Sequence, residues 1–161
     1  MSGTRLPEDL EAMPPRPELA VLLAGVDRSD LDADDLLRLA QARSRLVAHQ
    51  EAQLLADLHA VARKVPDSGP LPGRRDPGKY PWAECEVAFA LRWTHRRATG
   101  QLIFSDELID RLPAVFAALS AGQLDVPKAR LIADAVAGLA DDRVAAAVAD
   151  KVLDLAPRLT T

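Results

Sequence analysis

The sequence predicts an all-α fold: an elongated helical bundle with one long N-terminal helix and about five shorter helices. The 161 residues are rich in Ala and Leu and poor in aromatic and strand-favouring residues, which favours helices. No proline interrupts residues 32–64, and apolar residues recur there at spacings of three and four, as on one face of a helix. Glycines, prolines and capping residues divide the rest of the chain into shorter helical segments.

Two segments precede the long helix. Residues 1–16 contain three prolines and little apolar periodicity, so we predict a flexible N-terminal arm with at most one turn around Glu8–Met13. A helical domain then spans residues 17–161. Its first helix covers Glu18–Ala24, and Gly25 ends it because glycine can adopt the left-handed conformation at a helix C-terminus.

The long helix is predicted to cover residues 32–64. Ser29 or Asp32 can cap its N-terminus, because both side chains accept hydrogen bonds from backbone amides. A helix of about 30 residues extends about 45 Å, which is long for a domain of this size. We therefore expect part of its stripe to face another chain, as in a homodimer; the alternative is that the polar members are solvated. The stripe consists of Leu36, Leu39, Arg43, Leu46, Gln50, Leu54, Leu58 and Val61.

Residues 65–81 are predicted to form a basic loop, because they contain five prolines and three glycines. We interpret this loop as a linker between the long helix and a helical bundle at residues 82–156. Alternatively, Arg74 and Arg75 make it a strap that contacts phosphates.

The bundle is predicted to begin with two helices joined by a tight turn. The first covers Trp82–Arg92, and Trp93 packs in the turn. Thr94 is suited to cap the second helix, which continues to Leu112. A break at Gly100 is the alternative, since glycine costs a helix interior up to about 1 kcal/mol relative to alanine. The residues expected to face inward are Val87, Ala88, Leu91, Ala98, Leu102, Ser105, Leu108 and Ile109.

Three shorter helices follow. Pro113 lacks an amide donor, so the preceding helix ends there and a short one begins. Gly122 ends that helix, Asp125 caps the next one, and Asp141 or Asp142 caps the last. The residues expected on their buried faces are Val115, Phe116, Leu119, Leu131, Ile132, Ala135, Val136, Leu139, Val144, Val148, Val152 and Leu155.

Charge is distributed unevenly along the chain. The net charge is −4, but residues 63–97 carry eight basic and four acidic residues between two acidic flanks. This pattern predicts a local basic region and argues against a wholly basic surface. Cys85 is the single cysteine, which excludes an intramolecular disulfide, and we expect it to be a small buried residue.

The sequence shows no targeting signal. Its N-terminus lacks the basic-then-apolar layout of a signal peptide, and no apolar run approaches the roughly 20 residues that span a bilayer. We therefore predict a soluble, cytoplasmic protein with no membrane partner.

No catalytic, cofactor or metal site is predicted. His49 and His59 are ten residues apart on one helix, which does not place them on one turn, and His95 is isolated. The acidic pair Asp34–Asp35 lies at a helix start, where capping explains it. The glycines of residues 69–73 alternate with prolines and follow no strand, unlike a phosphate-binding loop. We therefore expect a chain that is not an enzyme and needs no cofactor.

The densest basic cluster predicts a DNA interface. A helix, a three-residue turn and a second helix form the layout of a helix-turn-helix motif, whose second helix brings its N-terminal residues to base edges in the major groove. Arginine in that position can pair with guanine or hold a phosphate. The residues predicted to bind double-stranded DNA are Arg96, Arg97, Arg92, His95, Arg74 and Arg75.

Two alternatives to this interpretation remain. Helix pairs with tight turns are common in any bundle, and the arginines could solvate a surface or pair with Asp30, Asp34 or Glu84. A second candidate helix-turn-helix lies at Ala118–Arg130, but core packing explains its pattern better.

Two stretches of the chain resemble a known bacterial family. The first reads Trp-Ala-Glu at 82–84 and continues through Ala-Leu-Arg-Trp-Thr at 90–94 to Ala98. The second has Leu-Pro-Ala at 112–114, Ala-Leu at 118–119, Ala-Gly-Gln-Leu-Asp at 121–125 and Pro-Lys-Ala-Arg at 127–130. Together they resemble the bacterial domain-of-unknown-function family numbered 222, which includes the 13E12 repeat proteins. The resemblance covers roughly residues 18–161 and is most specific in the second stretch.

In that family the helical domain is commonly followed by an HNH-type nuclease domain. The resemblance therefore implies a helical, DNA-associated module, the non-catalytic targeting or regulatory part of such a protein. The sequence ends at Thr161 without a downstream His-Asn-His motif, so we expect truncation before a nuclease domain and assign nuclease activity to no residue. The alternatives are a dimerisation or protein-interaction module built on residues 32–64, and a remnant without function.

Overall fold

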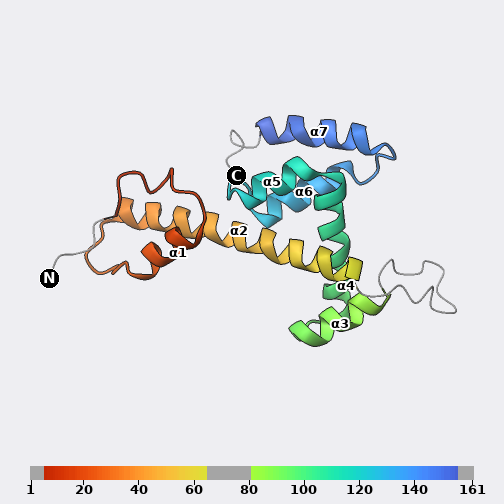
Figure 1. Cartoon of the computed structure of the whole chain (residues 1–161). Coiled ribbons are helices and arrows are strands. Elements are labelled where there is room, and N and C mark those ends of the chain that lie inside the picture. Colours follow the sequence, from red (N-terminus) through yellow and green to blue (C-terminus); the bar gives the residue numbers. More distant parts are fainter. Residues whose placement is uncertain (1–5, 65–80, 156–161) are drawn as a thin grey trace.

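The computed structural model describes residues 6–64 and 81–155 (Figure 1). These residues form seven α-helices and no strand, which confirms the all-α prediction and its long helix near the N-terminus. None of these helices is both long and apolar enough to cross a bilayer. The helices are α1 Pro17–Ala24, α2 Ala33–Lys64, α3 Pro81–Leu91, α4 His95–Asp106, α5 Pro113–Ser120, α6 Val126–Val136 and α7 Asp142–Leu155.

The long helix α2 forms the axis of the molecule (Figure 1). Its 32 residues extend about 48 Å at a rise of about 1.5 Å per residue. The residues before α2 pack on its N-terminal half, α5 and α6 lie along its middle, and α3 and α4 lie at its C-terminal end. α7 covers the far side of α5 and α6. The other helices therefore pack on α2 as three groups, one near each end and one at its middle.

Three separate cores follow from this layout, and α2 contributes to each of them. It buries Leu39 and Ala42 at the N-terminal end, Ala52 and Leu55 in the middle, and Leu58 against α3 and α4. These residues lie on different faces of α2, because successive partners approach the helix from different sides. The predicted single stripe is therefore split. Leu39 and Leu58 are buried, whereas Leu36, Leu54 and Val61 are exposed.

Residues 6–16 differ from the flexible arm that we predict from their prolines. Leu6 and Leu10 are buried in the N-terminal core, and a turn follows at the predicted place. Arg38 of α2 donates hydrogen bonds to the Pro7 carbonyl and to the Glu11 carboxylate. Arg45 of α2 donates to the Leu10 and Glu11 carbonyls, which Pro14 and Pro15 cannot pair because they lack an amide hydrogen.

Local capping signals set the helix starts as predicted. The Asp32 carboxylate accepts from the Asp35 amide at 2.8 Å, and the Thr94 hydroxyl oxygen accepts from the Arg97 amide at 3.2 Å. The Asp125 and Asp141 carboxylates accept from the first-turn amides of α6 and α7 in the same way. Each bond satisfies an amide that the helix itself leaves unpaired.

Two helix ends share one turn geometry. After α3, Arg92 has φ +52°, and the Trp93 amide donates to the Ala88 carbonyl at 2.9 Å. After α5, Gly122 has φ +70°, and the Gln123 amide donates to the Ala118 carbonyl at 2.9 Å. Both follow the Schellman pattern, in which a left-handed residue closes the helix. Gly25, predicted to close α1 in that way, instead has φ −86°.

The helix α4 runs through Gly100 without a break, as predicted. Beyond Asp106 the chain continues as a π-helical segment, Glu107–Arg111, in which the Leu112 amide donates to the Glu107 carbonyl. Pro113 then begins α5, also as predicted. The Arg111 guanidinium bonds the Glu107 and Asp142 carboxylates and the Leu139 carbonyl, so the widened turn anchors the connection between α6 and α7.

The predicted inward faces are wrong at several positions. Leu131 is 69% exposed, and Val144, Val148 and Leu91 are each at least 38% exposed. α7 instead buries alanines, and α6 buries alanines beside Ile132 and Val136, which are buried as predicted. Cys85, expected to be buried, is exposed. The alanines on these buried faces are Ala129, Ala133, Ala145 and Ala149.

Candidate nucleic-acid interface

The segment α3–turn–α4 has the predicted helix-turn-helix layout, and its basic residues lie at the start of α4. Arg92 in the turn and Arg96 in the first turn of α4 are exposed. Between Glu86 and Asp106 the chain contains no carboxylate. Among the described residues, neither arginine forms an ion pair. The first half of α4 is therefore a locally basic, unneutralised surface.

Aromatic rings hold two guanidinium groups on this surface. Arg97, Gln101 and Phe104 are spaced by four and three residues and so lie on one face of α4, and Trp93 in the preceding turn contacts Arg97. The guanidinium carbon of Arg97 lies 4.2 Å from the centroid of the Trp93 ring. Such a contact is favourable by about 0.5–1 kcal/mol at an exposed site and fixes the plane of the guanidinium.

The second guanidinium comes from α6. The guanidinium carbon of Arg130 lies 4.1 Å from the centroid of the Phe104 ring, and its Nη2 donates to the Gln101 side-chain oxygen at 3.0 Å. The Phe104 ring is only 5% exposed. Stacking restrains each guanidinium while leaving other N–H groups on its edge for an acceptor. Arg130 was predicted only as part of the second candidate helix-turn-helix, because its contacts with Gln101 and Phe104 arise only in the folded chain.

Between these groups lies a shallow groove of about 360 Å³. No carboxylate among the described residues lines it, so the charges that line it favour anions. Its lining residues are Thr94, Arg96, Arg97, Gly100, Gln101 and Arg130. An adjoining smaller hollow is lined by Trp93 from the turn, Arg97 from α4 and the acidic Glu51 from α2.

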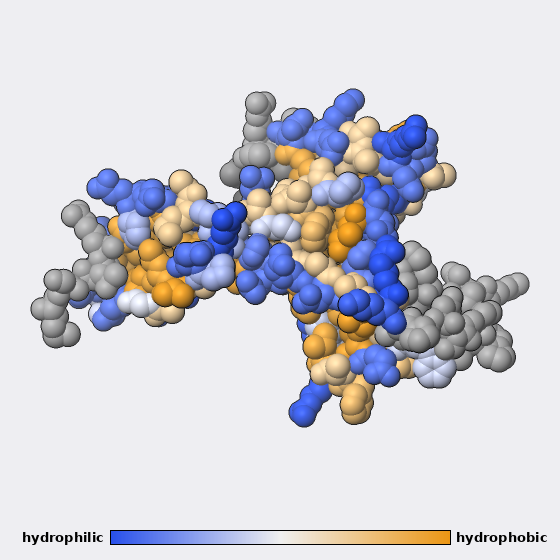
Figure 2. Space-filling view, in the orientation of Figure 1, coloured by the Kyte–Doolittle hydropathy of each residue, from blue (hydrophilic) through white to orange (hydrophobic). Residues whose placement is uncertain are grey.

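The remaining predicted DNA-binding residues are placed differently. His95 Nε2 lies 3.0 Å from Oε2 of Glu84, a carboxylate that is 2% exposed, so His95 ties α4 to α3. Arg74 and Arg75, with the rest of the predicted basic loop up to residue 80, lie outside the described residues. Figure 2 shows a band of hydrophilic side chains where α2 passes α4, and hydrophobic surface over α1 and α3.

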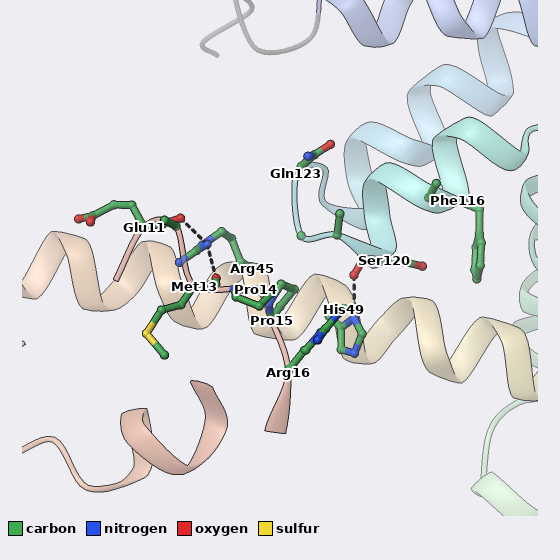
Figure 3. A pocket seen from close by; sticks show the side chains of 14 residues that line it. Glu11, Met13, Pro14, Pro15, Arg16, Arg45, His49, Phe116, Ser120 and Gln123 are labelled. Carbon is green, nitrogen blue, oxygen red and sulfur yellow. Dashed lines mark hydrogen bonds between the residues drawn. The ribbon is translucent and has the colours of Figure 1, made fainter. Parts of the chain in front are cut away.

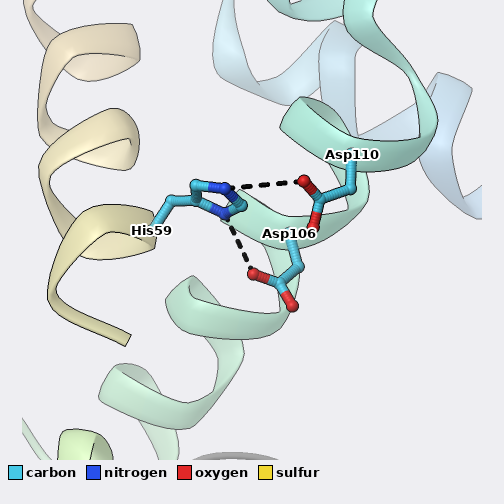
Figure 4. A group of neighbouring side chains, drawn as sticks. All are labelled: His59, Asp106 and Asp110. Carbon is cyan, nitrogen blue, oxygen red and sulfur yellow. Dashed lines mark hydrogen bonds and ion pairs between the residues drawn. The ribbon is translucent and has the colours of Figure 1, made fainter. Parts of the chain in front are cut away.

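A second cluster of polar side chains lies where the end of α2 meets the end of α4 (Figure 4). His59 Nδ1 lies 3.0 Å from Asp106 Oδ1, and both side chains are nearly buried, at 13% and 11% exposure. His59 Nε2 lies 3.5 Å from Asp110 Oδ1. The ligating atoms of these three residues lie within 4.8 Å of one another, a spacing that a metal ion could use.

An arginine already occupies the cationic position in this cluster. Arg63 Nε donates to His59 Nε2 at 2.8 Å, and Arg63 Nη2 donates to both Asp110 oxygens at 2.9 and 2.7 Å. Because His59 Nε2 accepts from Arg63, Nδ1 carries the proton and donates to Asp106. We interpret the cluster as an ion network that joins α2 to α4. The sequence analysis missed it, since no local signal links residue 59 to residue 106.

A hollow of about 770 Å³ lies between residues 11–16 and the α5–α6 turn (Figure 3). Two of its polar side chains, Arg45 and His49, are already engaged, whereas the buried Ser120 hydroxyl has no partner among the described residues. The Arg45 guanidinium donates to the Leu10, Glu11 and Met13 carbonyls, and His49 Nδ1 lies 2.7 Å from the Ser120 carbonyl. This hollow therefore marks a joint between two parts of the fold rather than a donor-rich binding site.

No curated protein and no solved structure matches the chain. A family model described as "Domain of unknown function (DUF222)" matches residues 32–161, which include α2 to α7 and the whole basic groove. The match covers most of the chain and confirms the resemblance noted from the sequence. The chain therefore belongs to the DUF222 family.

Proposed function

We propose that this chain binds DNA through the first half of α4, with Arg96, Arg97 and Arg130 contacting the phosphate backbone. The observation that carries the proposal is the pair of stacked guanidiniums beside a groove whose described lining contains arginines and no carboxylate. Phosphate contacts of this kind supply most of the affinity in protein–DNA complexes. The positive end of the α4 dipole adds to the same field.

The backbone at Arg92 supports the proposal. A side chain in the left-handed conformation costs about 1 kcal/mol relative to glycine. The equivalent position after α5 is Gly122, and glycine adopts the left-handed conformation there without that cost. The side chain retained at position 92 is an exposed arginine beside the groove helix. A strained residue that carries a charge at a surface favours a functional role for that charge.

The net charge of −4 limits this binding to one face of the molecule. A chain with acidic flanks repels DNA everywhere except at its basic region, which orients the complex. We further propose that this module acts as the targeting or regulatory part of a protein whose HNH nuclease domain supplies the chemistry.

The proposal is tested by fluorescence anisotropy of a labelled duplex, titrated with the chain at about 50 mM and about 200 mM salt. The Arg96→Glu, Arg97→Glu variant should bind at least about tenfold more weakly and show a shallower salt dependence. The matched control, Arg143→Glu with Lys151→Glu, changes the net charge equally at exposed positions of α7. Absence of binding at low salt, or equal losses in both variants, would falsify the proposal.

A second candidate function is self-association through α2, and one observation favours it. Val47, Leu54 and Val61 are exposed at 57%, 38% and 36% and are spaced by seven residues, the repeat of a coiled-coil seam. Sedimentation velocity at about 100 µM would test it, with Leu54→Lys as the disrupting variant and Leu131→Lys on α6 as the matched control. A monomeric wild-type chain at that concentration would exclude this function.

A further inference from the structure

Gly100 lies in the sixth position of the twelve-residue helix α4, where glycine is unfavourable. A glycine in a helix interior costs about 0.5–1 kcal/mol relative to alanine. Glycine usually occupies such a position because a neighbour leaves no room for a Cβ atom, or because the backbone requires a positive φ. Neither reason applies here. A Cβ atom built at residue 100 meets no described atom within 4 Å, and its φ is not positive.

Gly122, in contrast, is required by the structure itself. Its φ is +70°, and an added Cβ would lie 2.8 Å from both the Cβ and the carbonyl oxygen of Arg45. The fold therefore explains Gly122. The described residues give no packing reason for Gly100, and the open volume above it lets a ligand approach the helix backbone closely, which is a further use of glycine.

The surroundings of Gly100 identify the chemistry of that ligand. Gly100 belongs to the groove lining, one helical turn after Arg96 and Arg97, and Arg130 reaches the same groove from α6. Three guanidiniums thus line the groove around a patch of bare helix, and none of the described residues that line it is a carboxylate. An oxyanion with several acceptor atoms matches this donor set, because guanidinium groups bind phosphate with several N–H donors.

We propose that the bare surface at Gly100 seats one backbone phosphate of the bound DNA, held by Arg96, Arg97 and Arg130. Glycine keeps the groove shallow enough for the sugar–phosphate chain to lie against α4. This inference rests on the proposed DNA-binding function and adds the position of a contact to it. The stacking of Arg97 on Trp93 and of Arg130 on Phe104 holds two of the three donors in place before DNA arrives.

Substitutions at Gly100 test the seat without changing any charge. Gly100→Leu fills the groove, and leucine favours a helix, so the variant should fold. Gly100→Ala places a single Cβ atom in the seat and should weaken DNA binding by an intermediate amount, about threefold, while raising helix stability. The matched control is Gly138→Leu, at an exposed turn where a Cβ atom also meets no described atom within 4 Å. All variants are titrated against the labelled duplex at several salt concentrations.

The proposal expects Gly100→Leu to bind DNA about tenfold or more weakly, which is the effect of losing a charge-assisted contact. The slope of log affinity against log salt should fall by about one, because one phosphate is no longer neutralised. Gly138→Leu should match the wild type. If the wild type and Gly100→Leu bind DNA equally, the proposed phosphate contact at Gly100 is refuted, while the DNA-binding proposal stands. If the wild-type chain does not bind, both proposals fall together.

Discussion

Replacing Gly122 by alanine should destabilise the fold strongly, because two independent costs act at that position. A non-glycine residue at φ +70° costs about 1–2 kcal/mol. The new Cβ would also lie 2.8 Å from the Cβ and the carbonyl oxygen of Arg45, and forcing atoms into a packed site typically costs about 1–3 kcal/mol. Together these predict a loss of about 3 kcal/mol.

Arg45 cannot easily move aside. It lies within α2, and its guanidinium is hydrogen-bonded to three carbonyls of residues 10–13. The strain should therefore shift the α5–α6 turn away from α2. For a chain of this size, a loss of about 3 kcal/mol lowers Tm by about 6–12 °C.

The assay is guanidinium denaturation followed by circular dichroism, with Gly100→Ala as the comparison. That second glycine-to-alanine change should raise the free energy of unfolding by about 0.5–1 kcal/mol, because it meets no described neighbour and improves helix propensity. The two substitutions should therefore change the free energy of unfolding in opposite directions. A Gly122→Ala variant within about 0.5 kcal/mol of the wild type would refute the close-contact argument.

Three further predictions concern charges. Arg92→Gly should raise the free energy of unfolding by about 1 kcal/mol, since glycine suits the left-handed turn, yet weaken DNA binding; denaturation and anisotropy measure the two effects. Glu51→Gln should strengthen DNA binding by about two- to threefold at low salt, because it removes a negative charge beside Arg97. The Arg38 guanidinium lowers the pKa of the Glu11 carboxyl below 4.5, so this contact stabilises the fold above that pH and is lost as pH falls through the lowered pKa. The difference in denaturation midpoint between the wild type and Glu11→Gln should accordingly be constant near neutral pH and vanish in acid.

Helix boundaries could be predicted from the sequence because their signals are local. Asp32, Thr94 and Asp125 each accept a hydrogen bond from an amide within three residues, so their effect does not depend on the rest of the fold. Proline acts on its own backbone in the same local way. Such signals predicted most of the helices that the structure contains.

The choice of buried face could not be predicted in this way. On α7 the larger valines, including Val144, suggested the buried side, but Ala145 and Ala149 face the core because α5 lies close to that side. Burial on a helix with apolar residues on two faces is decided by its neighbours. A hydrophobic pattern read from one helix does not contain that information.

The residues of the candidate site likewise differ in whether local sequence signals identify them. Arg96 and Arg97 were found because they are adjacent in sequence at the start of a helix. Arg130 was not predicted to join them because it reaches the groove from another helix, and its contacts with Phe104 and Gln101 exist only in the folded chain. The ion network of His59 has the same origin, since its partners come from α4 and the segment that follows.

The course of α2 through three cores has a consequence for how the protein opens. The N-terminal core is joined to the others through α2 and through the contact between Arg45 and Gly122. Amide protons around Leu10 and Leu23 should exchange as one cooperative unit, while those of α4 and α5 remain protected, because each core can lose its packing separately. The family match begins at residue 32, just before α2, so the small end core is built from residues on both sides of that boundary. Local unfolding of the N-terminal core would leave the basic groove, at the opposite end of α2, folded.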